Sequence, residues 1–184
     1  MEKTLNNLRT AIIGETTASQ KYAAFSQKAK QEGYSKIAIL FEAISQSEAI
    51  HAANHKRALE YLLKEKVEIE PNKFEVKSTA ENLQNAIEGE TYEVETMYPE
   101  FIEIAKQEEV KRAVGTFSDA LASERKHKPI YENALAILKE NKENTMPSKY
   151  YICPACGFTY DEFDVKDVCE VCGVKKEKFL EFQL

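Results

Sequence analysis

The chain has 184 residues, of which 43% are hydrophobic and 30% charged, a composition typical of a globular protein. Its formal net charge of -6 argues against a general nucleic-acid-binding protein, which needs a basic face. Only 6 Gly and 5 Pro interrupt the sequence, which favours long helices over a β-sandwich or barrel. Because no apolar run is long enough for a membrane span or a signal peptide, we expect a cytoplasmic protein without a membrane partner.

The first part of the chain predicts two long amphipathic helices. From about residue 3 to residue 31, the residues of one stripe recur at steps of three and four, and Gly33 offers a stop. A second stripe of the same period runs from about residue 35 to residue 64. The segment "EKVEIEPNKFEVK" then contains Pro71 and has no helical period, so it predicts a long connection.

Two further helices are predicted after this connection. The third begins at "STAE", where Ser78 and Glu81 have the spacing of a capping box, and its stripe extends to Ile104. Pro99 lies inside this segment and Pro129 inside the fourth, and each should kink its helix, because it removes a backbone donor. The fourth helix is expected over about 110–139. Two short connections and one long one are typical of a four-helix bundle with a single crossover.

Four carboxylates interrupt the apolar stripes of these helices. A buried, unpaired carboxylate costs several kcal/mol, so four of them would cancel a typical folding stability of about 5–15 kcal/mol. Something must therefore neutralise them. The residues that stand where Leu or Ile would be expected are Glu15, Glu48, Glu90 and Glu124.

An internal repeat explains these carboxylates. "GET" at residues 14–16 recurs at residues 89–91, and "SEAIH" at residues 47–51 recurs as "SERKH" at residues 123–127. Each half thus supplies one Glu from its first helix and a Glu-x-x-His from its second, the constellation of ferritin-like di-iron and di-manganese proteins. Carboxylates bridge hard cations, and the i, i+3 spacing places the imidazole on the same helix face. The predicted ligands are Glu15, Glu48, His51, Glu90, Glu124 and His127.

Several neighbouring residues each have two interpretations. One Glu-x-x-His is usually a solvated pair, but two on apolar stripes with matching "GET" tripeptides favour a metal site. Tyr22 and Tyr98 each either hydrogen-bond a metal carboxylate or serve as core tyrosines with satisfied hydroxyls. His55 has no counterpart in the second half and is interpreted as a buried structural histidine. Glu93 also breaks the repeat, and it is either an extra carboxylate beside the site or a solvated helix residue.

The four cysteines form a second candidate metal site near the C-terminal end. They occur as two C-x-x-C pairs, Cys153 with Cys156 and Cys169 with Cys172, and each pair is followed by Gly. In a reducing compartment this favours a tetrahedral four-sulfur site over disulfides, and both Zn and a single Fe fit. From spacing alone, a structural zinc ribbon is the simpler alternative. We therefore predict a bundle over 1–140, a linker over 141–149 and a metal-binding domain over 150–184.

With these residues in place, the chain resembles the rubrerythrin family, a ferritin-like di-iron bundle followed by a rubredoxin-like domain. The resemblance implies two Fe in the bundle and one Fe, rather than Zn, at the four cysteines. It also adds Glu93 to the six bundle ligands, assigns Tyr22 and Tyr98 to hydrogen bonds near the metals, and implies that Glu93 replaces His51 on one iron upon oxidation. The motifs that carry it cover nearly the whole chain: "GETTASQKY", "SEAIH", "GETYEVETMYP", "SERKH" and "YICPACGFTYD…CEVCG".

The same resemblance implies a function. Electrons would pass from the four-cysteine iron to the di-iron site, which would reduce hydrogen peroxide to water in protection against oxidative stress. An external donor, a rubredoxin or an NAD(P)H-dependent reductase, would supply them. A ferroxidase or iron-storage protein shares the bundle site but has no need of the cysteine domain, and a structural protein with two zinc sites is a further alternative. The sequence leaves open whether peroxide or dioxygen is the oxidant.

We also predict a homodimer, with the exchange of helices between subunits left open. The linker begins at one end of the bundle, whereas the Glu and His residues lie near mid-helix. A chain's own cysteine domain is therefore expected to be too distant for efficient electron transfer. On this hypothesis, the domain of one chain docks near the di-iron site of the other.

Overall fold

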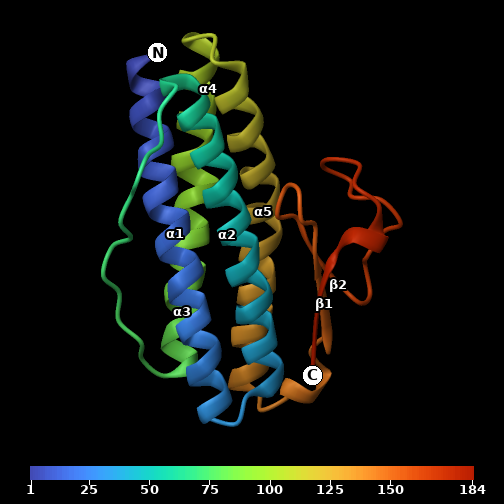
Figure 1. The fold of residues 1–184 in the computed structure, drawn as a ribbon. Coiled ribbons are helices and arrows are strands. Elements are labelled where there is room, and N and C mark those ends of the chain that lie inside the picture. The colour runs from blue at the N-terminus through green and yellow to red at the C-terminus, as the bar shows by residue number, and fades with distance from the viewer.

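The computed structural model describes all 184 residues, and long helices packed side by side dominate it (Figure 1). Helices α1 (Glu2–Gln31) and α2 (Ser35–Leu63) form an antiparallel hairpin that turns at Gly33, whose φ is 89°. The residues between α2 and α3 then run along the outside of the bundle from one end to the other. The predicted single crossover is thereby confirmed.

The third helical segment contains a local change of helix type. It starts with α3 (Thr79–Tyr92), whose first turn carries the predicted capping box. A five-residue π-helix, η1 (Glu93–Met97), follows and leads into α4 (Tyr98–Gln107), with Pro99 in the first turn of α4. The disturbance expected at Pro99 thus lies in the preceding turn as a π-helix, in which backbone hydrogen bonds span five residues instead of four. The last helix, α5 (Lys111–Lys139), contains Pro129 and is not interrupted there.

The bundle core consists of two apolar clusters with a polar layer between them. One cluster is centred on aromatic side chains such as Tyr22, Phe41 and Tyr131, and the other contains Leu8 and Phe117. Along each long helix, the buried apolar residues on one side of the ligand Glu belong to one cluster and those on the other side to the second, except that Ile50 belongs to the same cluster as the residues before Glu48. The polar layer is therefore enclosed by apolar side chains at both ends.

None of the helices has a hydrophobic stretch of the length needed to span a lipid bilayer.

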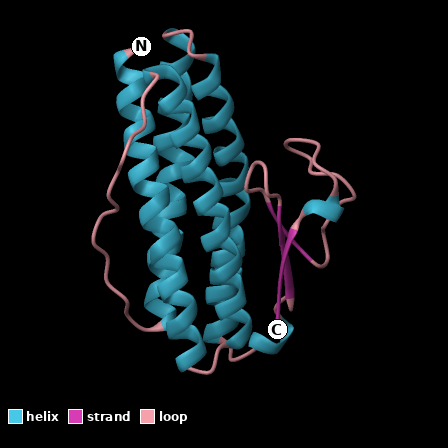
Figure 2. Cartoon of the chain, viewed as in Figure 1, coloured by secondary structure: helices cyan, strands magenta, loops and turns pink.

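The C-terminal residues form a small antiparallel sheet, drawn in magenta in Figure 2. Its strands are β1 (Lys149–Ile152), β2 (Thr159–Asp161) and β3 (Leu180–Gln183), in the order β2-β1-β3. Tyr151 of β1 pairs with Tyr160 of β2 and with Glu181 of β3. The two cysteine knuckles lie beside this sheet. The domain boundaries given above remain a prediction.

This sheet docks on the bundle of its own chain, against α2 and α5 (Figure 1). The chain reverses direction after α5, through the short helix η2 (Glu143–Thr145), and β1 runs back along the bundle. The carboxylate of Glu143 fixes this reversal by accepting a 2.6 Å hydrogen bond from the Lys36 backbone N–H at the start of α2. The expectation that a chain's own cysteine domain is too far from mid-helix is therefore wrong, because the linker leads the domain back.

Polar contacts hold the domain at mid-height on the bundle. The Ser47 hydroxyl donates a 2.6 Å hydrogen bond to the Gly157 carbonyl, and the Asn54 amide donates a 2.9 Å bond to the carbonyl of Ala155. Lys126 of α5 forms an ion pair with Asp164. The first two contacts join α2 to the first cysteine knuckle, and the third joins α5 to the segment between the two knuckles.

Gly157 and Gly173 are a matched pair for testing this docking. Both have positive φ, 83° and 75°, so alanine strains both knuckles. A Cβ on Gly157 would lie 2.4 Å from Nε2 of His51, whereas one on Gly173 would meet nothing within 4 Å. We expect Gly157→Ala, but not Gly173→Ala, to lift the domain from the bundle and increase the radius of gyration in small-angle X-ray scattering. An unchanged radius in both variants would contradict the docked arrangement.

Candidate metal centres

The bundle brings the six predicted ligands together in its polar layer. Glu15 comes from α1, Glu48 and His51 from α2, Glu90 from α3, and Glu124 and His127 from α5, and each is at most 1% exposed. Their ligand atoms form two groups, each lying within 4.8 Å. Glu48 and Glu124 belong to both groups, which is the arrangement that two bridging carboxylates require. The first group adds Glu15 and His51, and the second adds Glu90 and His127.

The two histidines occupy equivalent places in these groups. Nδ1 of His51 lies 2.9 Å from a carboxylate oxygen of Glu48 and 2.9 Å from one of Glu124. Nδ1 of His127 lies 2.7 Å from the other oxygen of Glu124 and 3.3 Å from that of Glu48. The imidazole rings are 6.3 Å apart, centroid to centroid. Each ring therefore presents Nδ1 to one metal position and turns Nε2 toward the outside of the bundle.

Buried atoms without hydrogen-bond partners show that the site fits two cations. One or two carboxylate oxygens of every bundle Glu in the two groups, and Nδ1 of His127, are buried without such a partner. Several of these atoms contact each other as carboxylate–imidazole pairs, but buried polar atoms without a hydrogen bond are rare in folded proteins and need an explanation. A set of oxygen and imidazole donors without sulfur suits hard or borderline cations, which include iron. The residues present thus fit a di-iron centre.

The electrostatics of the same residues show that protons and cations compete for the site. Burial raises the pKa of Glu124 to about 8, and the neighbouring Glu48 adds to the shift. Burial alone would lower the pKa of both histidines, but the surrounding carboxylates hold both pKa values well above the usual range. For Glu15, burial opposes ionisation, yet the contact with His51 lowers its pKa. Metal binding must therefore displace protons from this layer.

Two tyrosines and a third histidine fix the orientation of the carboxylates. Tyr22 donates a 2.9 Å hydrogen bond to Oε1 of Glu90, and Tyr98 donates one to Glu15. Of their two interpretations, the structure therefore favours hydrogen bonding to the ligand carboxylates. His55 lies outside both groups, and its Nε2 lies 3.0 Å from the Tyr98 hydroxyl. This geometry supports the interpretation of His55 as a structural residue.

Glu93 lies near the site but outside both ligand groups. It is the first residue of the π-helix and is partly exposed. Burial and the nearby carboxylates, Glu15 first among them, raise its pKa well above the ordinary value. The carboxylate is therefore within electrostatic range of the ligand carboxylates without sharing their ligand positions.

Two residues near the site were not predicted from the sequence to belong to it. Tyr131 lies one turn after His127 on α5, is fully buried, and has a hydroxyl without a hydrogen-bond partner. Its i+4 spacing from His127 could have indicated this position. Thr159 of β2 lies with its Oγ1 2.8 Å from Nε2 of His127, and no local pattern connects these two residues.

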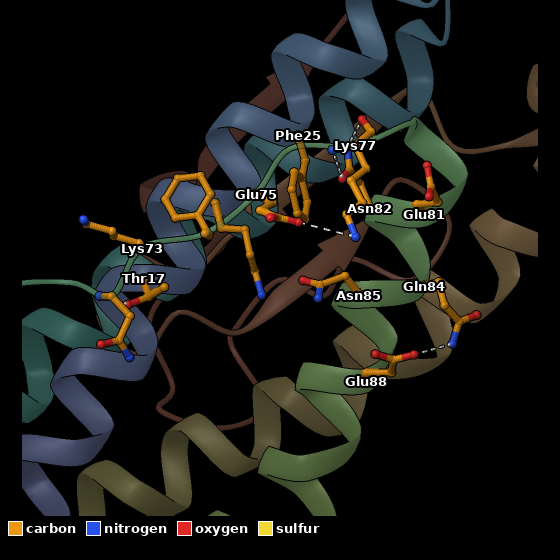
Figure 3. A pocket seen from close by; sticks show the side chains of 13 residues that line it. Thr17, Phe25, Lys73, Glu75, Lys77, Glu81, Asn82, Gln84, Asn85 and Glu88 are labelled. Carbon is orange, nitrogen blue, oxygen red and sulfur yellow. Dashed lines mark hydrogen bonds and ion pairs between the residues drawn. The ribbon is translucent and has the colours of Figure 1, made fainter.

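A polar cavity of about 630 Å³ opens on another side of the bundle, beneath the crossover (Figure 3). Its lining includes Thr17 and Lys21 of α1, Lys73 of the crossover, and Asn85 and Glu88 of α3. Burial lowers the pKa of the Lys21 amine, while the carboxylates of Glu93, Glu90 and Glu48 oppose that shift. Positive charge on Lys21 thus acts on the ligand layer from the cavity side. Figure 1 shows the crossover and the cysteine domain on opposite sides of the bundle.

The four cysteines also form a compact group. Sγ of Cys153 lies 3.4 Å from Sγ of Cys172, and Sγ of Cys156 lies 3.5 Å from Sγ of Cys169. A tetrahedral ion with metal–sulfur bonds of about 2.3 Å has sulfur–sulfur edges of roughly 3.8 Å, so only a small expansion is needed. A hydrogen bond from Cys156 is the main cause that lowers the pKa of Cys153 to about 5. Three of the four thiols are buried.

A di-metal carboxylate layer in a four-helix bundle, with a four-cysteine domain docked on it, defines a ferritin-like di-iron protein of the two-domain type. The family model described as Rubrerythrin matches residues 6–135. The chain is 39% identical over 179 residues to Rubrerythrin-2 of Clostridium acetobutylicum, covering 97% of this chain and 96% of that protein. The chain belongs to the rubrerythrin family.

Nigerythrin is a further relative. Over 184 residues the chain is 36% identical to nigerythrin of Nitratidesulfovibrio vulgaris, covering 96% of this chain and 85% of that protein. The solved mixed-valence structure of nigerythrin matches with a TM-score of 0.87 and 33% identity, over 97% of this chain and 86% of that one. The bundle thus holds a di-iron carboxylate site and the cysteine domain a rubredoxin-like iron site, and the protein is an oxidoreductase of this family.

The pKa shifts predict how metal binding changes stability with pH. In the metal-free protein the pKa of Glu124 is about 8, compared with an ordinary value of 4.5. The pKa values of both histidines lie well above their ordinary value of 6.5. Groups with raised folded-state pKa values stabilise the fold at low pH, and this contribution is lost as the pH rises through those values. Glu15, with its lowered pKa, is ionised in both states above about pH 5 and contributes a constant amount.

We therefore expect the melting temperature of the metal-free protein to fall relative to that of the ferrous protein between about pH 5 and pH 8. Anaerobic differential scanning calorimetry of both forms measures the difference. A difference that narrows with rising pH would contradict the protonation scheme.

Proposed function

We propose that this protein is a non-haem iron peroxidase that reduces hydrogen peroxide to water, with electrons entering through the four-cysteine iron site. The observation that carries the proposal is the docking of a cysteine knuckle over both ligand histidines. Gly157, which follows Cys156, lies against His51, and Thr159 contacts His127. An iron-storage or ferroxidase protein shares the bundle ligands but gives no reason for this contact, so it is the less supported alternative.

The contacts on the histidine side suit electron transfer. The backbone between Cys156 and Thr159 is buried against α2 and α5, and Ser47 holds the Gly157 carbonyl. A short path thus connects one sulfur ligand of the first centre to the imidazoles of the second: it is covalent from Cys156 to Thr159, and it reaches His51 by packing and His127 by a hydrogen bond. Iron held by the two ligand sets would carry the donor's electrons and supply Lewis acidity, and all of the contacts that position this path lie within one chain.

The remaining sides of the site suit substrate and proton delivery. Because the domain covers the histidines, we propose that peroxide approaches from the side of Glu93, Lys21 and the cavity beneath the crossover. Reduction of one peroxide to two waters consumes two electrons and two protons. Tyr22 and Tyr98 hold hydroxyl protons directly on Glu90 and Glu15 and are placed to relay them.

The partners follow from this division of roles. We propose an external electron donor, a rubredoxin or an NAD(P)H-dependent reductase, which reduces the four-cysteine iron at the exposed edge near Cys172. We propose that the protein is a cytoplasmic homodimer. In this dimer, electrons pass between the two centres of the same chain. Protection against oxidative stress is the role that such a reaction serves.

Metal analysis of three variants tests the assignment of the two centres. Glu48→Ala and Glu124→Ala each remove a carboxylate shared by both bundle groups, so each should lose bundle iron, keep the red four-cysteine iron and lose peroxide reduction. Cys153→Ser should do the reverse for metal content. Glu42→Ala, which removes an exposed carboxylate of α2, serves as the control. Full donor-driven peroxide consumption by the Glu48 or Glu124 variant would overturn the proposal.

We further propose that Glu93 replaces His51 as an iron ligand when the site is oxidised, because ferric iron is harder and prefers a carboxylate. Glu93→Ala should keep both bundle irons when reduced, raise the di-iron reduction potential and slow turnover. Glu95→Ala in the same π-helix is the control, since Glu95 is exposed and pairs with Lys128. Crystal structures of oxidised and reduced protein in which His51 stays bound in both states would contradict the exchange.

A further inference from the structure

The cysteine domain contributes one buried side chain directly to a bundle ligand. Thr159 is the first residue of β2 and is fully buried. Its Oγ1 lies 2.8 Å from Nε2 of His127, a residue 32 positions earlier in the chain. The contact therefore joins the two domains at a side chain of the metal layer rather than at a peripheral surface.

The chemistry of the imidazole decides the direction of this hydrogen bond. Nδ1 of His127 faces Glu124 and Glu48 and is the nitrogen available to a metal. A neutral ring bound through Nδ1 must carry its proton on Nε2. Nε2–H then donates to Thr159, whose own hydroxyl points to the carbonyl of Gly157 at 3.5 Å.

The other ligand histidine lacks such a partner. Nε2 of His51 is buried without a hydrogen bond and lies against Gly157, which has no side chain to offer. The domain therefore holds one histidine by a hydrogen bond and covers the other only by packing. This difference distinguishes two metal positions that the ligand groups alone make equivalent.

We propose that Thr159 is a positioning residue for the bundle ligand His127: its hydroxyl accepts the Nε2 proton and so fixes the tautomer and ring orientation that present Nδ1 to the metal. The metal affinity of the bundle thereby depends on the docked cysteine domain, and the metal position at His127 is the more firmly held. Outer hydrogen-bond partners of ligating histidines typically change metal affinity by about 10–100-fold. This inference rests on the bundle metal site and not on peroxide reduction.

The test measures metal binding by the full-length protein without any turnover. The four-cysteine site is first filled with Zn²⁺, and the bundle is then titrated with Co²⁺, whose visible absorption reports its ligands. We expect Thr159→Val, which keeps the shape and removes the hydroxyl, to weaken Co²⁺ binding about 10–100-fold at one of the two positions. Thr159→Ser, which restores the hydroxyl, should recover the wild-type affinity.

Asp164→Asn separates this effect from a general loss of docking. It weakens the ion pair with Lys126 but leaves both ligand histidines and Thr159 in place. An equal loss of affinity in Asp164→Asn and Thr159→Val would overturn the proposal, and so would wild-type affinity in Thr159→Val. A wild-type measurement that does not depend on any variant is ¹⁵N NMR of the Zn²⁺-loaded protein. We expect a slowly exchanging Nε2–H on His127, and a rapidly exchanging one would refute the hydrogen bond.

Discussion

The structure depends on one constraint: four glutamates are buried beside two histidines in the middle of a small helical bundle, and the negative charge of the glutamates must be neutralised by bound protons or metal ions. Carboxylates in this setting, without partners for several of their oxygens, destabilise the fold unless protons or metal ions are bound. The two apolar clusters on either side isolate this layer from water. This strengthens the repulsion between the carboxylates when no metal is bound, and it strengthens their attraction to metal ions when metal is bound. The position of the metal pair is thus set by the core packing.

The same layer determines where the cysteine domain can act. Nδ1 of each ligand histidine points into the bundle. Nε2 therefore points toward the outer face of α2 and α5, where the cysteine domain docks. Gly157 allows close approach to His51, and Thr159 supplies a hydrogen bond to His127. The same backbone and side-chain atoms of Gly157 and Thr159 therefore dock the domain, contact the ligand histidines and connect the two metal centres. The opposite side, with the π-helix and Lys21, is not covered by the cysteine domain (Figure 1).

Local sequence patterns predict the helices, the crossover and the ligand set, because helical periodicity and the repeated Glu-x-x-His are both properties of neighbouring residues. They do not predict the π-helix at Glu93, since a Pro that removes a backbone donor predicts a disturbed helix at Pro99 but not whether the helix bends or widens. They also missed the return of the cysteine domain to its own bundle and the contact of Thr159. Ser47 and Gly157, for example, are 110 residues apart, and only the folded linker shows that they meet.

Iron-edge anomalous diffraction from crystals of the reduced full-length protein tests the central claim most directly. The account predicts three iron peaks per chain: two in the bundle, bridged by Glu48 and Glu124, and one among the four cysteines. A bundle with a single peak or none, in protein that retains its four-cysteine iron, would show that protons rather than metals neutralise the buried carboxylates and would contradict the account.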